Sequence, residues 1–206
     1  MADCCNDKAC EIEALRGRQK STLKIVLAIN AVMFIVELTA GLLGHSVSLV
    51  ADSLDMLGDA LVYGFSLYVV ARGAIMKARA ALFKGIIMAG FGVLVLGQAI
   101  YRIVFPQLPV FETIGVIGLL ALAANGVCFY LLWRHRADDI NMSSVWLCSR
   151  NDIIANISVL FAAAGVWLVH AGWPDIVVGV ALAALFLRSA VHVLNEAIKE
   201  LRTAKD

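Results

Sequence analysis

Residues 42–69, LLGHSVSLVADSLDMLGDALVYGFSLYV, place three carboxylates in a stretch that is otherwise apolar enough for lipid. Burying a carboxylate in a bilayer costs about 2.5–3.5 kcal/mol on insertion scales, so such residues usually face a cavity or a partner. Asp55 and Asp59 are four residues apart and therefore share one helical face, about one turn from each other. Two oxygen ligands on one face inside a membrane predict a cation site. A structural role in hydrogen bonding between helices is the alternative for this pair.

The composition of the whole chain is that of an integral membrane protein. Of its 206 residues, 61% are hydrophobic and 16% are charged, and the mean hydropathy is +0.85. Soluble domains contain about 45–50% apolar residues. The net charge of +1 gives no reason to expect a nucleic-acid partner. Residues 1–24 are polar and lack the apolar core of a cleavable signal peptide.

Apolar windows of the length that spans a bilayer, about 20 residues, predict an all-α bundle of six membrane helices. The windows cover residues 24–44, 48–71, 81–105, 111–133, 145–170 and 174–195. We therefore expect one transmembrane domain over residues 23–198, with a Cys-containing tail at 1–22 and a short tail at 199–206. The segments 48–71 and 145–170 carry most of the polar residues, so we expect them to pack inside the bundle.

Basic residues predict that both termini and both tails are cytoplasmic. They gather before the first window, after the second, after the fourth and at the end of the sixth: Arg16, Arg18, Lys20, Lys24, Arg72, Lys77, Arg79, Lys84, Arg134, Arg136, Arg188, Lys199, Arg202 and Lys205. The opposite connections, near 44–46, 105–110 and 171–173, have only Arg102 nearby. Loops rich in lysine and arginine stay on the cytoplasmic side.

A second pair of potential ligands lies in WLCSRNDIIANISVLFAAAGVWL, residues 146–168. Cys148 and Asp152 are also four apart and share a helical face. With Asp55 and Asp59 they could form a four-ligand tetrahedral site. One sulfur and three carboxylates suit Zn²⁺ or Cd²⁺ better than Mg²⁺ or Ca²⁺, which prefer shells made of oxygen alone. The alternative for Cys148 is a small buried apolar residue.

The order and spacing of these motifs resemble the cation diffusion facilitator family of divalent metal/proton antiporters. The resemblance covers nearly all of residues 24–200. Asn30 and Glu37 precede GLLGHSVSLVADSLDMLGDA (41–60), which is similar to the family's N…E…G…SxALxADxxHxxxD stretch. The stretches DINMSSVWLCSRNDIIANISV (139–159) and WPDIVVGVALAALFLRSAVHVLNEA (173–197) resemble its fifth-helix and sixth-helix motifs. We expect no counterpart here of the family's soluble C-terminal domain.

The resemblance implies a transport site with two ligands from residues 48–71 and two from 145–170. Those positions fall on Asp55, Asp59, Cys148 and Asp152. Cys148 stands where the family usually has histidine or aspartate, and a thiolate there should favour softer ions. The resemblance therefore implies a transporter, not an enzyme, that exports Zn²⁺, with Cd²⁺ and then Co²⁺ close behind, across a bacterial inner membrane.

Metal/proton exchange by alternating access is consistent with the chemistry of these ligands. Carboxylates and a thiolate must lose their protons to bind metal, so metal ions and protons compete for the same groups. A soft-metal transporter for Hg²⁺ or Cu⁺ is one alternative, suggested by the cysteines. An intramembrane metalloenzyme is another, but the sequence offers no general base beyond the ligands. A purely structural subunit would bind no metal when purified.

Other residues are assigned accessory roles. Cys4, Cys5 and Cys10 form a Cys-Cys-x₄-Cys group in a segment that looks disordered, and they either capture metal near the entrance or have no role in transport. Asn151 and Asn156 are expected to be packing residues rather than ligands.

Further polar residues are expected to have pathway or structural roles: Glu37, Asp52, His45 and Arg150. Arg150 is expected to pair with an acid or to extend to the membrane surface. We expect a homodimer through the membrane helices, using the small residues of segment 81–105 (Gly85, Ala89, Gly90, Gly92 and Gly97).

Overall fold

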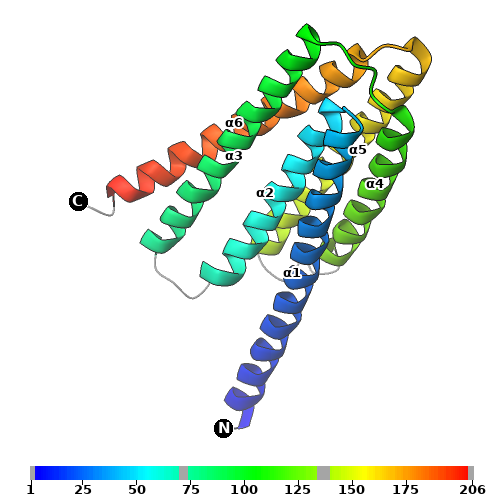
Figure 1. The fold of residues 1–206 in the computed structure, drawn as a ribbon. Helices are drawn as coiled ribbons and strands as arrows, with labels where there is room; N and C mark the ends of the chain where they lie inside the picture. The colour runs from blue at the N-terminus through cyan, green and yellow to red at the C-terminus, as the bar shows by residue number, and fades with distance from the viewer. Residues whose placement is uncertain (1–2, 70–73, 134–139, 204–206) are drawn as a thin grey trace.

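The computed structural model describes residues 3–69, 74–133 and 140–203, and these fall almost entirely into helices (Figure 1). The elements are α1 (Asp3–Leu43), α2 (Val47–Val69), α3 (Ala74–Val104), α4 (Phe111–Trp133), α5 (Ile140–Val169) and α6 (Trp173–Thr203). The described residues contain no strand. The prediction of an all-α six-helix membrane bundle is confirmed.

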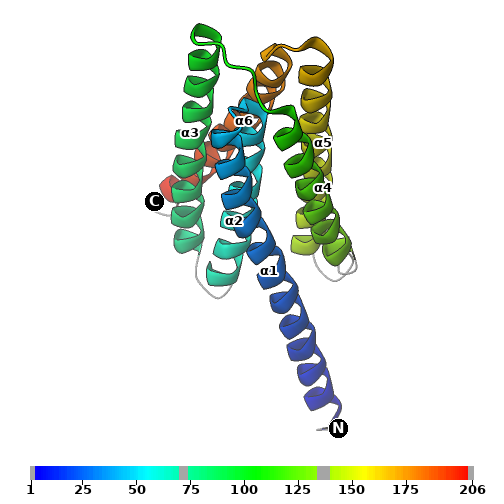
Figure 2. The ribbon, with the colours of Figure 1, turned by 45° about the vertical axis from the view of Figure 1, so that its right-hand side comes forward.

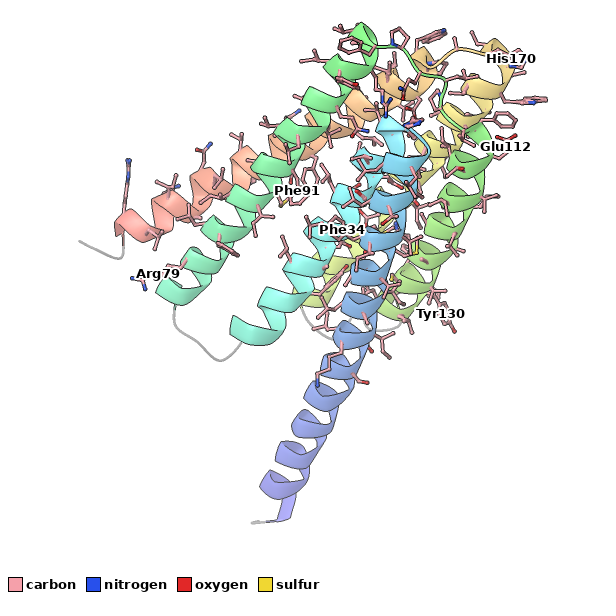
Figure 3. All side chains as sticks on the ribbon, in the orientation of Figure 1. Phe34, Arg79, Phe91, Glu112, Tyr130 and His170 are labelled. Carbon is pink, nitrogen blue, oxygen red and sulfur yellow. The ribbon has the colours of Figure 1, made fainter. Side chains whose placement is uncertain are left out.

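Successive helices run in opposite directions, so the short connections fall at two ends of the bundle. Residues 44–46, 105–110 and 170–172 lie at one end, which we call the loop end, and both termini lie toward the other (Figures 1 and 2). In the side-chain view, His170 and Glu112 mark the loop end, whereas Arg79 and Tyr130 lie toward the opposite end (Figure 3).

The first helix is longer than predicted. It begins at Asp3 and continues through the segment that we expected to be a disordered tail. Residues 8–20 are rich in alanine, glutamate, lysine and arginine, which have high helix propensity, and they contain no proline. The side chains of residues 1–20, including Cys4, Cys5 and Cys10, lie outside the described part of the structure.

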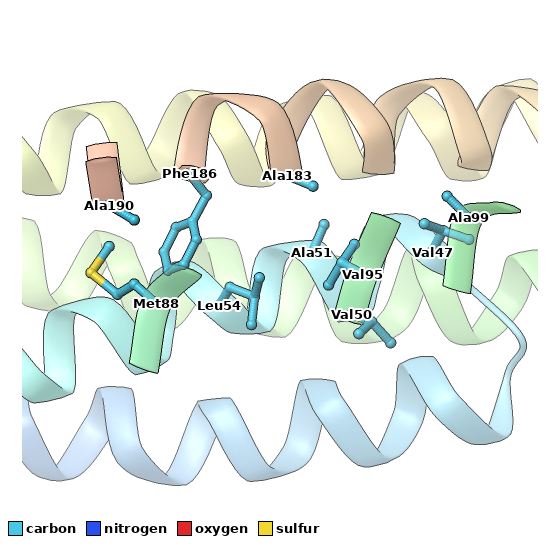
Figure 4. Packing of buried hydrophobic residues seen from close by; sticks show 10 residues of the cluster. All are labelled: Val47, Val50, Ala51, Leu54, Met88, Val95, Ala99, Ala183, Phe186 and Ala190. Atoms are coloured by element: carbon cyan, nitrogen blue, oxygen red, sulfur yellow. The ribbon is translucent and has the colours of Figure 1, made fainter. Parts of the chain in front are cut away.

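The helices pack as two groups that meet at α2. The pair α3 and α6 packs closely together, and α1, α2, α4 and α5 form the second group (Figure 2). A buried apolar cluster joins the groups: Val47, Val50, Ala51, Leu54, Met88, Val95, Ala99, Ala183, Phe186 and Ala190 (Figure 4). The rings of Phe34 on α1 and Phe91 on α3 also meet edge to face, with centroids 6.2 Å apart (Figure 3). Burying α2 on both sides shields its carboxylates from lipid.

The outer surface of the bundle is apolar, as a bilayer requires. Large side chains such as Ile35, Leu94, Val116 and Phe161 are 62%, 67%, 65% and 71% exposed. Within the described residues, five of the helices are long and apolar enough to cross a membrane, and α2 is not among these five. Although α2 has 23 residues, Asp52, Asp55 and Asp59 lower its hydropathy. It is therefore suited to cross the bilayer only inside the protein.

The small residues of α3 divide between two faces. A Cβ atom on Gly85 would lie 2.7 Å from Leu194, and one on Gly92 would lie 2.5 Å from Leu187, so these glycines allow α6 to approach α3 within the same chain. Cβ atoms on Gly90 and Gly97 would meet nothing within 4 Å. The expectation that Gly85 and Gly92 form part of a dimer face is therefore wrong, because α6 already covers them.

A carboxylate from α6 caps the start of α2. Asp175 accepts hydrogen bonds from the backbone N–H groups of Val47 (2.6 Å) and Ser48 (3.2 Å). It also accepts bonds from the hydroxyls of Ser46 (2.6 Å) and Ser48 (2.5 Å). Asp175 is 0% exposed. An anion at a helix N-terminus satisfies free N–H groups and opposes the positive end of the helix dipole. Asp175 thus fixes α6 to α2 at the loop end.

Candidate metal transport site

Two of the predicted ligands lie on the face of α2 that turns toward the other helices. Asp55 and Asp59 are both partly buried, one helical turn apart. Tyr63 follows Asp59 by a further turn, and its hydroxyl donates a hydrogen bond of 3.0 Å to Asp59 Oδ2. Tyr63 is 1% exposed, so this bond forms inside the protein. The hydroxyl orients the Asp59 carboxyl from the side away from Asp55.

Asp152 on α5 is the third predicted ligand whose side chain the structure describes. Its carboxyl interacts electrostatically with those of Asp59 and Asp55. The second oxygen of Asp152, Oδ2, is buried and has no hydrogen-bond partner. Three of the four predicted ligands, Asp55, Asp59 and Asp152, thus interact electrostatically between the two predicted helices.

The fourth predicted ligand, Cys148, lies on α5 one turn before Asp152, and its side chain is outside the described part of the structure. The same holds for the side chains of Arg150 and Asn151. Among the histidine, cysteine, aspartate and glutamate residues that are described, no three form a group compact enough to hold a metal ion. The three carboxyls therefore interact without forming a closed metal shell, and the ligand set remains a prediction.

A cysteine that the sequence analysis assigned no role lies beside this site. Cys128 on α4 is 1% exposed and interacts electrostatically with both Asp59 and Asp152. The Asn30 side chain on α1 donates to its sulfur over 3.8 Å and to the carbonyl of Val26 over 2.9 Å. No spacing rule within one helix would have revealed this neighbour, because Cys128 comes from a different helix.

Asn156 continues the polar face of α5 by one turn. Its amide donates a hydrogen bond of 2.8 Å to the backbone carbonyl of Asp152, and its Oδ1 atom is buried without a partner. At 0% exposed, Asn156 is a packed side chain that supports the α5 backbone at Asp152.

The remaining polar residues that the sequence singled out lie nearer the loop end. Glu37 on α1 and Asp52 on α2 are fully buried, and the structure gives their carboxyl oxygens no hydrogen-bond partner. His45 is only partly buried, and its Nδ1 atom lies 2.9 Å from a guanidinium nitrogen of Arg102. Arg102 also contacts Gln107. A histidine paired with a guanidinium is poorly placed to bind a second cation, so the contact favours a structural role for His45.

Comparison with known proteins settles the family. The model of the cation efflux transmembrane domain matches residues 23–202. The chain belongs to this family. It is 24% identical over 205 residues to the metal cation efflux system protein CzcD of Cupriavidus metallidurans, covering 89% of this chain and 64% of that protein.

Two further relatives show a similar level of identity. The zinc transporter ZitB of Pectobacterium atrosepticum is 27% identical over 202 residues, which are 90% of this chain and 62% of that protein. A cadmium, cobalt and zinc/H⁺-K⁺ antiporter of Bacillus velezensis is 25% identical over 202 residues, covering 90% and 64%. The chain thus spans less than two thirds of the length of the relatives it matches. It is an integral membrane protein of a family whose members are cation transporters.

Proposed function

We propose that this protein exports divalent transition-metal ions, Zn²⁺ foremost with Cd²⁺ and Co²⁺ close behind, in exchange for protons by alternating access. The observation that carries the proposal is the interaction of Asp59 on α2 with Asp152 on α5 inside the membrane domain. Acidic residues within membrane-spanning segments cost free energy to bury, and they usually mark an ion pathway. The names of the relatives, which include zinc, cadmium and cobalt transporters, support the choice of ion.

The same carboxyls explain why protons would be the counter-ion. A proton on one of these carboxyls would leave the empty site with less negative charge, which lowers the cost of carrying it through the bilayer. A metal ion can enter only if that proton leaves, because metal ligands must be deprotonated. Protons entering from outside would then displace the metal, which gives net efflux. We propose no catalytic reaction at this site.

We further propose that the protein resides in the inner membrane of a bacterium with both termini in the cytoplasm. The exposed basic side chains of Lys24, Arg79 and Arg202 support this orientation, since they belong to helix segments at or toward the end of the bundle opposite the loop end. A homodimer through the membrane helices would have the open Gly90 and Gly97 face of α3 available to it.

The test is metal uptake into reconstituted inside-out vesicles with an acidic interior. Wild-type protein should accumulate Zn²⁺, and an uncoupler that collapses the proton gradient should stop it. Asp59→Ala and Asp152→Ala should each abolish uptake while the protein still inserts, whereas Glu112→Ala, an exposed acid in the first turn of α4, should not. Wild-type uptake by both aspartate variants would refute the site. A panel that includes Hg²⁺ and Cu⁺ would reveal a soft-metal transporter.

A further inference from the structure

Asn156 on α5 has a buried oxygen that packing does not explain. The side chain is 0% exposed. Its Nδ2 atom donates a hydrogen bond of 2.8 Å to the Asp152 carbonyl, whereas its Oδ1 atom is buried and has no partner among the described residues. Packing therefore accounts for the NH₂ half of this amide but not for its oxygen. Buried polar atoms are nearly always hydrogen-bonded, so the free Oδ1 atom requires a water molecule or an ion.

The orientation of this amide is fixed by its hydrogen bond. Exchanging the amide oxygen and nitrogen would place two oxygens 2.8 Å apart, with no proton between them. The backbone N–H groups around Asn156 already bond within α5, which extends more than a full turn to either side. On α2, the hydroxyls of Ser53 and Tyr63 are used in other hydrogen bonds. The Oδ1 atom is thus an acceptor that these donors leave free.

The face of α5 that carries Asn156 turns toward the inside of the bundle. Val159 and Ala163 follow Asn156 by three and seven positions and therefore share its face. Both belong to a buried apolar cluster with Leu49 on α2 and Ile114 on α4. The Asn156 side chain consequently lies on the side of α5 that packs against α2 and α4.

Two free oxygens follow one another along this face. Asp152 precedes Asn156 by one turn, about 6 Å along the helix axis, and its Oδ2 atom is also buried without a partner. Because α5 ends at Val169, at the loop end, Asn156 lies on the loop-end side of Asp152 (Figure 1). Beyond Asn156 the face continues with the apolar Val159 and Ala163. A cation that moves from Asp152 toward the loop end would meet the Asn156 oxygen last.

A neutral oxygen suits this position. The predicted ligands Asp55, Asp59 and Asp152 already supply negative charge, and an amide oxygen adds coordination without adding more. Burying an amide costs much less free energy than burying another charge. Asparagine carbonyl oxygens are established ligands of divalent cations in proteins.

We propose that the Oδ1 atom of Asn156 is a neutral oxygen ligand for the transported divalent cation, on the loop-end side of Asp152. The inference rests on the proposed function and adds to that site a ligand that is neither a carboxylate nor a thiolate. A carbonyl oxygen is a hard ligand, so it should favour Zn²⁺ and Co²⁺ over Cd²⁺. In this respect it opposes the soft sulfur predicted at Cys148.

The first test titrates Co²⁺ into the purified protein and follows its visible d–d bands, which strengthen as the coordination number falls. Asn156→Leu removes the oxygen at similar volume, so it should weaken Co²⁺ binding about tenfold or more and strengthen the bands. Asn156→Asp keeps an oxygen and should bind Co²⁺ at least as tightly as wild type. Ser158→Ala is the matched control and should behave as wild type. Ser158 makes the same kind of hydrogen bond, to the Ile154 carbonyl four residues back, on the opposite face of α5.

Unchanged affinity and unchanged bands in Asn156→Leu would overturn the proposal and leave water as the partner of Oδ1. Loss of Co²⁺ binding by Asn156→Asp would also overturn it, because the NH₂ group, which aspartate lacks, would then be the half that matters. In competition between Zn²⁺ and Cd²⁺, Asn156→Leu should shift binding toward Cd²⁺. An asparagine that only supports the helix would not change this ratio.

A measurement on wild type covers the case in which Asn156→Leu does not fold. In ¹³C NMR of protein labelled at the asparagine side-chain carbonyls, the resonance that Asn156→Asp lacks should shift when Zn²⁺ binds to wild type. A resonance that stays in place would refute the ligand role. If wild type binds neither Co²⁺ nor Zn²⁺, the metal-transport proposal fails and this ligand with it. Metal binding by wild type with no change in Asn156→Leu refutes the role of Asn156 alone.

Discussion

Replacing Asp175 with alanine should destabilise the protein severely, because one side chain satisfies four donors at the start of α2. Of these donors, the hydroxyls of Ser46 and Ser48 lie 3.2 Å apart and can bond to one another after the change. The backbone N–H groups of Val47 and Ser48 cannot. Each buried donor left unsatisfied costs about 1–3 kcal/mol, so two of them give a loss of about 4 kcal/mol in the free energy of unfolding.

The assay is equilibrium unfolding in mixed micelles with increasing SDS, followed by circular dichroism. Asp175→Asn should lower the free energy of unfolding by about half as much as Asp175→Ala does. Its amide keeps one oxygen acceptor but turns an NH₂ group toward the remaining donors. Glu112→Gln, in the exposed first turn of α4, should change stability by about 0.5 kcal/mol or less. If Asp175→Ala unfolds within about 0.5 kcal/mol of wild type, the cap is not what joins α6 to α2.

Three other changes test separate parts of the structure. Gly179→Ala should lower the free energy of unfolding by about 1–3 kcal/mol in the same assay, because its Cβ atom would lie 2.8 Å from the backbone carbonyl carbon of Val47. Gly90→Ala is the matched control and should be tolerated, because a Cβ atom there would meet nothing within 4 Å. Tyr63→Phe should weaken Zn²⁺ binding about tenfold in calorimetry by removing the hydroxyl that orients Asp59, and unchanged affinity would contradict that role. Cys148→His should shift selectivity from Cd²⁺ toward Zn²⁺ in competition titrations while transport continues; no shift would mean that the cysteine only packs.

The helices and the in-chain spacing of the acids could be read from the sequence. Asp55 and Asp59 share a face because the helical period places residues four apart together, and this period depends on nothing beyond the local chain. The ends of α1 and α6 were less predictable. A hydropathy window identifies only the apolar part of a helix. Both α1 and α6 continue beyond that part into charged sequence, where the residues have high helix propensity.

Contacts between helices could not be obtained in the same way. Cys128 reaches Asp59 and Asp152 from α4, and Asp175 reaches Ser48 from α6 across a sequence separation of 127 residues. Such contacts depend on which helices are neighbours and how each is rotated about its axis. A hydropathy window contains no information on helix neighbours or helix rotation, so the sequence predicted which acids are ligands but not what surrounds them.

The Asp175 cap also determines how the two groups of helices can move relative to each other. It fastens α6 to α2 at one end, and in the described residues the apolar contacts of α2 with α3 and α6 extend from Val47 to Gly58, where a Cβ atom would meet Phe186 and Met88. If the α3–α6 pair turned about this fixed end, α6 would act as a lever. Because α6 has 31 residues and is about 45 Å long, a tilt of about 10° would carry its free end about 8 Å while leaving the pivot nearly still. Rocking of this kind would admit water and ions at the end that bears the termini.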